Sequence, residues 1–418
     1  MLTNYLKIAW KVLLRRKFFT FISLFGISFT LMVLLVVYAM FDYTTGPHTP
    51  ERRADRLLFI SRMQLLNKDG SGQSNSGVGY AFLNRYVRTL RTPEKVSLSE
   101  GYFTEVPAYV GEHTLRLDRK YSDGEFWQVL DFDFLEGRPY TPAEVRDAAH
   151  VAVINESTAR NYFGTAAGVV GRTLEADAVR YRVVGVVRDV PISRILSYAD
   201  FWVPITTTTD DLRRPDYLGD YQAIVLARSA ADVPAVKQEY ADIINRVPVP
   251  DPKQFGSVHS YAHTLLAALV GQADNSAGAD GGVGRLTSVG LGLALLFMLL
   301  PALNLVNVNV SRMLERASEI GVRKAFGATA GTLVGQFLVE NIFLTLLGGA
   351  LGLGLAAGAL HLLNASHFMP YSAFALNGRV FGVALAVVVF FGILSGVYPA
   401  YKMSKLRAVQ ALKGETTA

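Results

Sequence analysis

The chain has 418 residues, 50% of them hydrophobic, and its mean hydropathy is +0.26. This is apolar for a soluble protein and polar for a wholly embedded one, so it predicts membrane spans joined to a water-exposed domain. The net charge of +6 does not indicate nucleic-acid binding, because lysine and arginine gather beside the apolar runs, where they would face anionic membrane lipids. The absence of cysteine excludes disulfides, thiolate metal sites and cysteine nucleophiles.

Four apolar segments are long enough to cross a membrane, which takes about 20 apolar residues. The first, residues 18–41, would be about 36 Å long as a helix. A retained span is favoured over a cleaved signal peptide, because the run is too long and no small-residue cleavage site follows it. The other three segments are residues 286–310, 332–363 and 379–400.

Basic residues beside these segments predict their orientation, because lysine and arginine are enriched in cytoplasmic flanks. They occur in residues 1–17, 311–330 and 401–418, whereas the short external loop 364–378 has none. With four spans, the three basic flanks share one side, so both termini are expected in the cytoplasm and residues 42–284 outside. Residues 1–17 are interpreted as an amphipathic helix on the inner leaflet, with an extension of the first span as the alternative. Residues 401–418 would be a cytoplasmic tail.

The region between the first two spans mixes strand and helix patterns. Strands are expected at residues 57–60, 109–110, 114–117, 151–154, 181–187, 201–205 and 221–226, and helices at 156–163 and 233–247. Asn155 is the expected N-cap and Gly164 the expected end of the first of these helices. Residues 67–79 and 272–284 are rich in glycine and small polar residues, so we expect a mobile loop and a flexible joint. The predicted fold is therefore a membrane protein with four transmembrane α-helices and an α+β extracytoplasmic (periplasmic) domain inserted between helices 1 and 2.

The sequence contains none of the common catalytic motifs. The stretch closest to a phosphate-binding loop, residues 168–173, has the wrong spacing and no lysine, so ATP hydrolysis is expected in a partner subunit. His259 and His263 are spaced like metal ligands, but the glutamate of a zinc protease is missing between them, and a solvent-facing or hydrogen-bonded pair is favoured. No nucleophile elbow is present. We therefore expect neither enzymatic activity nor a bound metal or cofactor.

The segment between the second and third spans carries the strongest functional signal. Met313, Ala317 and Ile320 share one helical face, and charges of both signs occupy the rest, with Glu319 and Arg323 forming a favourable i,i+4 pair. A helix that only anchors to lipid is the alternative, but such anchors are usually basic without interleaved acids. Docking to a protein partner is favoured. The candidate docking residues are Arg312, Glu315, Arg316, Glu319, Ile320, Gly321, Arg323, Lys324 and Gly327.

Polar and small residues within the spans predict helix contacts. Asn304 and Asn307, in the second span, are interpreted first as helix-packing contacts and second as part of a substrate path. The third span carries small residues four apart, which allow close approach within the subunit or across a dimer. These pairs are Gly348 with Gly352 and Gly354 with Gly358.

Several of these segments resemble a known family. Residues 304–307, 315–328 and 336–340 are similar to the signature of MacB/FtsX-like ABC transporter permeases, as are 398–400 and 409–413 near the C-terminus. In the external region, weaker matches occur in the family's order and resemble its periplasmic core domain. These are residues 123–126, 136–138, 153–156, 171–172 and 184–187.

The resemblance implies a permease subunit of the bacterial inner membrane that works as a homodimer, or with a similar permease, and with two copies of a separate ABC ATPase. The docking segment would touch the ATPase, and the first two spans would lever the external domain to export or extract a substrate. A periplasmic adaptor or effector would be a further partner. The glycine-rich residues 272–284 depart from relatives whose second span continues as a rigid stalk. Two alternatives stay open: a non-transporting scaffold that regulates a periplasmic partner such as a cell-wall hydrolase, and a sensor.

Overall fold

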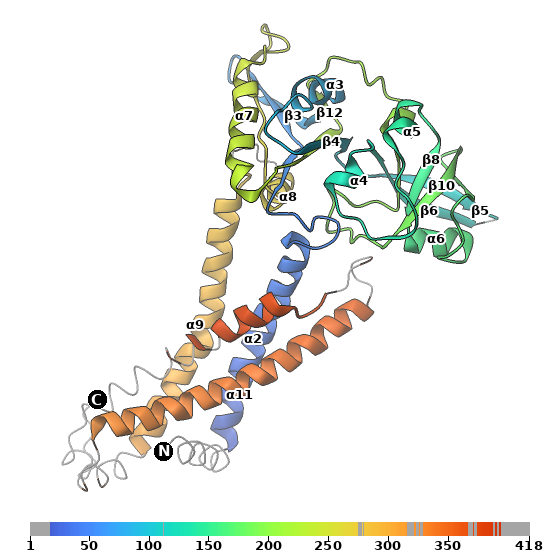
Figure 1. The fold of residues 1–418 in the computed structure, drawn as a ribbon. Coiled ribbons are helices and arrows are strands. Elements are labelled where there is room, and N and C mark those ends of the chain that lie inside the picture. The colour runs from blue at the N-terminus through green and yellow to red at the C-terminus, as the bar shows by residue number, and fades with distance from the viewer. Residues whose placement is uncertain are drawn as a thin grey trace. The chain divides into compact units, whose positions relative to one another are not determined.

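The computed structural model describes residues 17–111, 113–274, 278, 280–315, 322, 326, 329–366, 371, 374–387, 389–390 and 393. The chain divides into two compact units, whose elements are drawn in Figure 1. Unit 1 comprises Met1–Asp42, Ser288–Ser366 and Ala373–Ala418. Unit 2 comprises Tyr43–Thr287 and His367–Ser372.

Unit 1 is built from apolar helices. They include α2 (Lys17–Thr45), which runs on into unit 2, α9 (Val283–Glu315), α11 (Ala330–Ala365) and a shorter apolar helix at Gly378–Val387. Among the described residues, two helical stretches are long and apolar enough to cross a membrane, Thr20–Thr45 and Leu338–Ala365. Each of the four predicted spans thus falls on helix where it is described, and the complete four-span layout stays a prediction. Of the predicted N-terminal amphipathic helix (1–17) only Lys17 is described, and the predicted tail (401–418) lies wholly outside the described residues.

Unit 2 is an α+β domain whose fourteen described strands form one connected sheet. Its order is β11-β8-β10-β9-β5-β6-β4-β13-β3-β2-β14, with β1 on β13, β12 on β3 and β7 on β10. Because β11 also pairs with β6, strands β11, β8, β10, β9, β5 and β6 close into a ring. The strands are β1 Leu57–Ile60, β2 Met63–Asn67, β3 Gln73–Val78, β4 Lys95–Glu100, β5 Thr104–Val110, β6 His113–Ser122, β7 Phe134–Gly137, β8 Val151–Asn155, β9 Thr173–Ala176, β10 Val179–Val187, β11 Phe201–Pro204, β12 Leu218–Gly219, β13 Tyr221–Leu226 and β14 Phe255–His259.

Short helices cover this sheet, and one hydrophobic core joins the layers. The helices are α3 Tyr80–Phe82, α4 Phe126–Val129, α5 Pro142–Arg146, α6 Glu156–Phe163, α7 Val233–Arg246 and α8 Leu265–Asp274, with a π-helical turn at Leu83–Val87 and 3-10 turns at Ile205–Thr207 and Ala230–Asp232. Trp127 lies at the centre of an aromatic cluster, with ring centroids 5.3 Å from Tyr140 and 5.9 Å from Trp202. Large aromatic side chains of this kind supply much of the buried apolar surface of a core.

The strand–helix pair β8–α6 confirms its prediction. All five residues of β8 are buried, as expected for a strand inside a core. The Asn155 side chain then accepts a hydrogen bond from the Thr158 N–H at 2.7 Å, which satisfies a free donor of the first helical turn. Gly164 ends α6 with φ +75°, a conformation that glycine adopts without strain.

The expectation of a mobile loop at residues 67–79 was wrong, because β3 occupies its second half and pairs with β2. The glycines in this segment are explained by close contacts with a neighbouring backbone and not by flexibility of the segment. A Cβ at Gly77 would lie 2.6 Å from the Gly219 oxygen, and one at Gly79 only 1.9 Å from the Asp216 oxygen. Glycine is needed here because neighbouring backbones approach too closely for any side chain.

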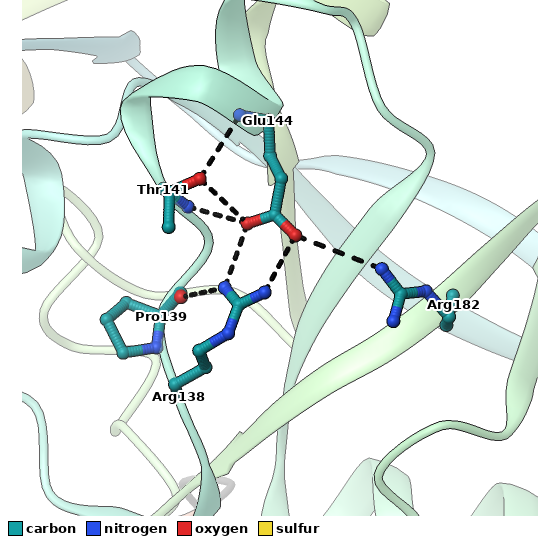
Figure 2. Close-up of polar contacts among 5 residues, drawn as sticks. All are labelled: Arg138, Pro139, Thr141, Glu144 and Arg182. Atoms are coloured by element: carbon teal, nitrogen blue, oxygen red, sulfur yellow. Dashed lines mark hydrogen bonds and ion pairs between the residues drawn. The ribbon is translucent and has the colours of Figure 1, made fainter.

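Figure 2 shows an ionic cap at the start of α5. Arg138 donates both guanidinium nitrogens to Glu144 at 2.9 Å, while Thr141 donates its N–H at 2.8 Å and its hydroxyl at 3.1 Å. Arg182 lies 3.9 Å from the same carboxylate. The Glu144 N–H in turn donates to Thr141 Oγ1, which completes a capping box. The hydrogen bonds, those from Arg138 first, lower the pKa of Glu144 from 4.5 to about 2.

Replacing Glu144 with glutamine should lower the free energy of unfolding at pH 7 by about 1–2 kcal/mol, a value reduced for solvent screening of the half-exposed arginine. Because the pKa is lower in the folded state, the stabilisation is complete above the ordinary glutamate pKa and disappears as the pH falls through about 2. Thermal unfolding at several pH values would measure it. Glu105→Gln, in an exposed pair with Arg116, is the control. An equal loss at pH 7 and pH 2 would contradict the assignment.

Candidate functional site

The C-terminal end of α2 is clamped inside unit 2 by Arg194, which lies between β10 and β11. Its Nη2 donates to the backbone oxygens of Tyr43 at 2.7 Å and Gly46 at 3.0 Å. Its Nη1 forms an ion pair with Glu51, and both side chains are 0% exposed. Glu51 also accepts a hydrogen bond from the Ser197 hydroxyl. Both Nη atoms of Arg194 and both carboxylate oxygens of Glu51 thus have partners, which is what allows an ion pair to be buried, whereas the buried Arg194 Nε has none among the described residues.

The segment that carries Arg194 is itself held by the sheet. Lys120 on β6 is fully buried and donates to the backbone oxygens of Ile195 and Leu196, both at 3.3 Å. Gln222 on β13 donates to the Leu196 oxygen at 2.8 Å. Burial lowers the pKa of Lys120 to about 8, and the charge of Glu100 opposes this shift. The clamp is therefore built on two strands of the core.

The chain leaves unit 2 toward α9 through a second packed junction. His263 has a pKa lowered by burial, and its Nε2–H donates to the Gly278 oxygen at 2.9 Å. Gly281 has φ +60°, and a Cβ there would lie 2.3 Å from the Ala267 oxygen of α8. Asp280 then accepts hydrogen bonds from the N–H groups of Gly282 and Gly284 at the start of α9. One glycine of the expected flexible joint, Gly281, thus packs against α8, and the first three residues of the joint, 272–274, belong to α8 itself.

Within unit 1, α2 and α11 touch through one pair of the predicted glycines. A Cβ at Gly348 would lie 2.8 Å from Ile27 Cγ2, and one at Gly352 would lie 2.9 Å from both Leu31 Cβ and the Ser28 oxygen. Gly354 and Gly358 have nothing within 4 Å of such an atom among the residues described. Both glycine pairs have the same four-residue spacing, but among the described residues only Gly348 and Gly352 contact α2.

The C-terminal end of α2 is also tied to the helix at Gly378–Val387. Asn377 Nδ2 donates to Asp42 at 2.6 Å, while Asn377 Oδ1 accepts the N–H groups of Arg379 and Val380 at 3.0 Å. Arg379 Nη1 lies 3.8 Å from Asp42. One asparagine thus caps a helix and joins it to its neighbour.

Most of the predicted docking residues fall outside the part of the chain that the structure describes. Arg312 and Glu315 lie in the last turn of α9, and Asn304 and Asn307 lie farther back on the same helix. Arg316, Glu319, Ile320, Gly321, Arg323, Lys324 and Gly327 are outside the described residues, and their role stays a prediction. Val322 and Phe326, which are described, are 45% and 88% exposed. His259 and His263 lie on β14 and in the loop after it rather than on one helix face.

An α+β domain whose chain continues into apolar helices at both ends defines a membrane protein with a large extramembrane domain. Residues 20–243 match the family described as MacB-like periplasmic core domain, and residues 291–408 match the FtsX-like permease C-terminal family. The chain belongs to the MacB/FtsX-like ABC transporter permeases. Both families are permease-type, and neither is enzymatic.

Curated relatives agree with this assignment. The macrolide export ATP-binding/permease protein MacB of Bdellovibrio bacteriovorus is 29% identical over 67% of this chain and 41% of the relative. The uncharacterized ABC transporter permease YknZ of Bacillus subtilis is 25% identical over 70% and 69%. The pyoverdine export ATP-binding/permease protein PvdT of Pseudomonas fluorescens is 24% identical over 97% and 59%. The chain therefore spans less than half the length of that MacB relative.

Solved structures give weaker similarities. The periplasmic region of MacB from Actinobacillus actinomycetemcomitans is 16% identical, covering 44% of this chain and 84% of that one, with a TM-score of 0.32. The extracellular domain of the ABC-type transporter YknZ from Gram-positive bacteria is 15% identical, covering 48% and 98%, with a TM-score of 0.36.

Proposed function

We propose that this chain is the permease subunit of an ABC transporter in which a separate cytoplasmic ATPase moves the external domain, unit 2, to export or extract a substrate. One observation carries the proposal: α2 is a continuous helix from Lys17 to Thr45, and Arg194 fixes its C-terminal carbonyls inside the domain. Transmission of mechanical work needs a stiff path, and packed interiors deform little. A helix whose end is fixed by a buried ion pair meets that need.

The second connection supports the same mechanism. A glycine-rich joint would absorb motion if it were free. Here Gly281 packs on α8, His263 holds Gly278, and Asp280 caps the start of α9. Movement of α9 would therefore also reach the domain.

The ATPase is proposed to bind the segment from Arg312 to Gly327, in two copies on a dimer of permeases. Phe326 is 88% exposed in this mixed-charge segment. An exposed aromatic side chain beside arginines is typical of a protein–protein contact, where aromatic residues and arginine are enriched. Gly354 and Gly358, where no described atom would lie within 4 Å of an added Cβ, are proposed to meet the second permease.

Both termini are proposed to lie in the cytoplasm and unit 2 in the periplasm of a bacterial inner membrane. Because the chain has no cysteine, single cysteines report position cleanly. In intact spheroplasts, Ser76→Cys should react with an impermeant maleimide, and Ser318→Cys should react only after lysis. The reverse pattern would rule out this orientation.

Replacing Glu319 and Arg323 together with alanine should reduce copurification of the ATPase and its permease-dependent ATP turnover by about tenfold or more, because a charged contact at the interface centre is lost. The measurement is ATP hydrolysis in a complex reconstituted in nanodiscs. Arg180→Ala, whose side chain is 77% exposed on unit 2, is the matched control. Unchanged complex formation and turnover would show that docking occurs elsewhere.

A further inference from the structure

A tyrosine that follows α11 is inserted into unit 2. Tyr371 comes five residues after Ser366, the C-cap of α11, yet its contacts assign it to unit 2. Its hydroxyl donates to Asp200 Oδ1 at 3.1 Å, and its ring centroid lies 6.2 Å from that of Tyr198. It also packs against the hydrophobic core of the unit. This side chain is therefore part of the domain rather than of the helices between which it occurs in sequence.

The socket for this tyrosine is organised by other contacts. Asp200 is 5% exposed, and its carboxylate also accepts Asn155 Nδ2 at 3.0 Å and the Asp118 N–H at 2.9 Å. Tyr198 donates its hydroxyl to Asp118 at 2.8 Å. Asn155 is in turn fixed as the N-cap of α6. Strands β6 and β8 and the start of β11 thus hold the acceptor in place.

Two further features show that the contact is specific. Tyr371 has φ +60°, which is rare for an aromatic residue and persists only where the surroundings offset the strain. Burial raises the pKa of Asp200 to about 6, and the Tyr371 hydrogen bond opposes this shift. A buried carboxylate needs donors, and Tyr371 supplies the third.

We propose that Tyr371 anchors the segment between the third and fourth apolar helices to the external domain, in the socket formed by Asp200, Asn155 and Tyr198. The domain then has three attachments to the membrane part of the chain: its junctions with α2 and α9, and this side-chain anchor.

Hydrogen exchange of the full chain in detergent tests the anchor. Tyr371→Ala should raise the exchange of peptides containing the Asp118 amide and the start of β11 about tenfold, since water gains access to Asp200. Tyr371→Phe, which keeps the ring and loses the hydroxyl, should raise it about threefold. Tyr109→Phe, on an exposed hairpin tyrosine, is the control and should change nothing. Wild-type exchange in both Tyr371 variants would overturn the proposal.

Cross-linking gives a second test that does not depend on exchange. In the cysteine-free chain, Ser372→Cys paired with Phe103→Cys keeps both Tyr371 and Tyr198, and the two thiols should be joined by a bifunctional reagent, because the Phe103 ring centroid lies 4.9 Å from that of Tyr198. Ser372→Cys with Ser76→Cys is the matched control, because β3 lies four strand steps from β11 through β6, β4 and β13, about 19 Å at the usual strand spacing. At least tenfold more product from the first pair supports the anchor, and equal yields overturn it. Neither test involves the ATPase, so the anchor and the proposed transport function can fail separately.

Discussion

Replacing Arg194 with methionine should lower the free energy of unfolding of the external domain by about 3–5 kcal/mol, because it leaves Glu51 charged and unpaired in the core. The backbone oxygens of Tyr43 and Gly46 lose their donor in the same step. For a domain of this size the melting temperature should fall by about 6–20 °C. Differential scanning fluorimetry of the full chain in detergent would measure the change.

Two further variants separate the effect of the buried ion pair from that of losing an arginine elsewhere. Arg180→Met breaks an exposed ion pair with Glu175 and should change stability by less than about 1 kcal/mol. The double variant Arg194→Met with Glu51→Met removes both charges and should recover much of the loss, since an apolar pair of similar volume can replace a buried ion pair. A double variant no more stable than Arg194→Met would show that the hydrogen bonds to α2, rather than the charge pair, dominate.

Replacing Gly352 with valine should separate α2 from α11 and destabilise unit 1 by about 1–3 kcal/mol, the usual cost of forcing extra atoms into a packed contact. A Cβ added at this position would lie 2.9 Å from both Leu31 Cβ and the Ser28 backbone oxygen. Neither atom can move away by a rotamer change, because one belongs to the helix backbone and the other is the first carbon of its side chain. If helix movements transmit work, coupled ATP turnover should fall with stability.

Gly354→Val is the matched control, because it adds the same β-branched residue two positions along the same helix, where no atom of the described residues lies within 4 Å of an added Cβ. The stability of the isolated chain in detergent should differ clearly between the two variants. Equal melting temperatures would refute the contact between α2 and α11. A loss confined to the assembled transporter in Gly354→Val would locate the second permease at this face.

Local chemistry made part of the fold predictable. The buried run of β8, the asparagine cap and the terminal glycine of α6 all lie within fourteen residues, and each acts on its neighbours. The same reasoning failed at β3, where glycine and serine suggested a loop. The cause was the Asp216–Gly219 backbone, which is distant in sequence and presses against Gly77 and Gly79. The helices α3, α4, α5 and α8 were also missed, as were strands β2, β4, β7, β9, β12 and β14.

The candidate site was harder to predict, because its partners are far apart in the chain. Arg194 and Glu51 are separated by 143 positions, and Tyr371 and Asp200 by 171. One local signal was available: Arg194 stands among Ile192, Ile195 and Leu196, and an arginine in an apolar stretch often has a buried partner. The glycine spacing indicated close helix contacts in the third span. The spacing did not distinguish Gly348 and Gly352, which meet α2, from Gly354 and Gly358, which have no neighbour within 4 Å in the part of the chain that the structure describes.

The buried pair of Glu51 and Arg194 also sets where the external domain can be cut from the membrane part of the chain. The first strand begins at Leu57, so a soluble fragment starting just before it would keep the whole sheet. That fragment would nevertheless lack Glu51 and leave the Arg194 guanidinium without a counter-charge. A fragment that begins at Tyr43 retains the carboxylate and the two carbonyls that Arg194 binds. The last residues of a membrane helix are, in this sense, the first residues of the soluble fold.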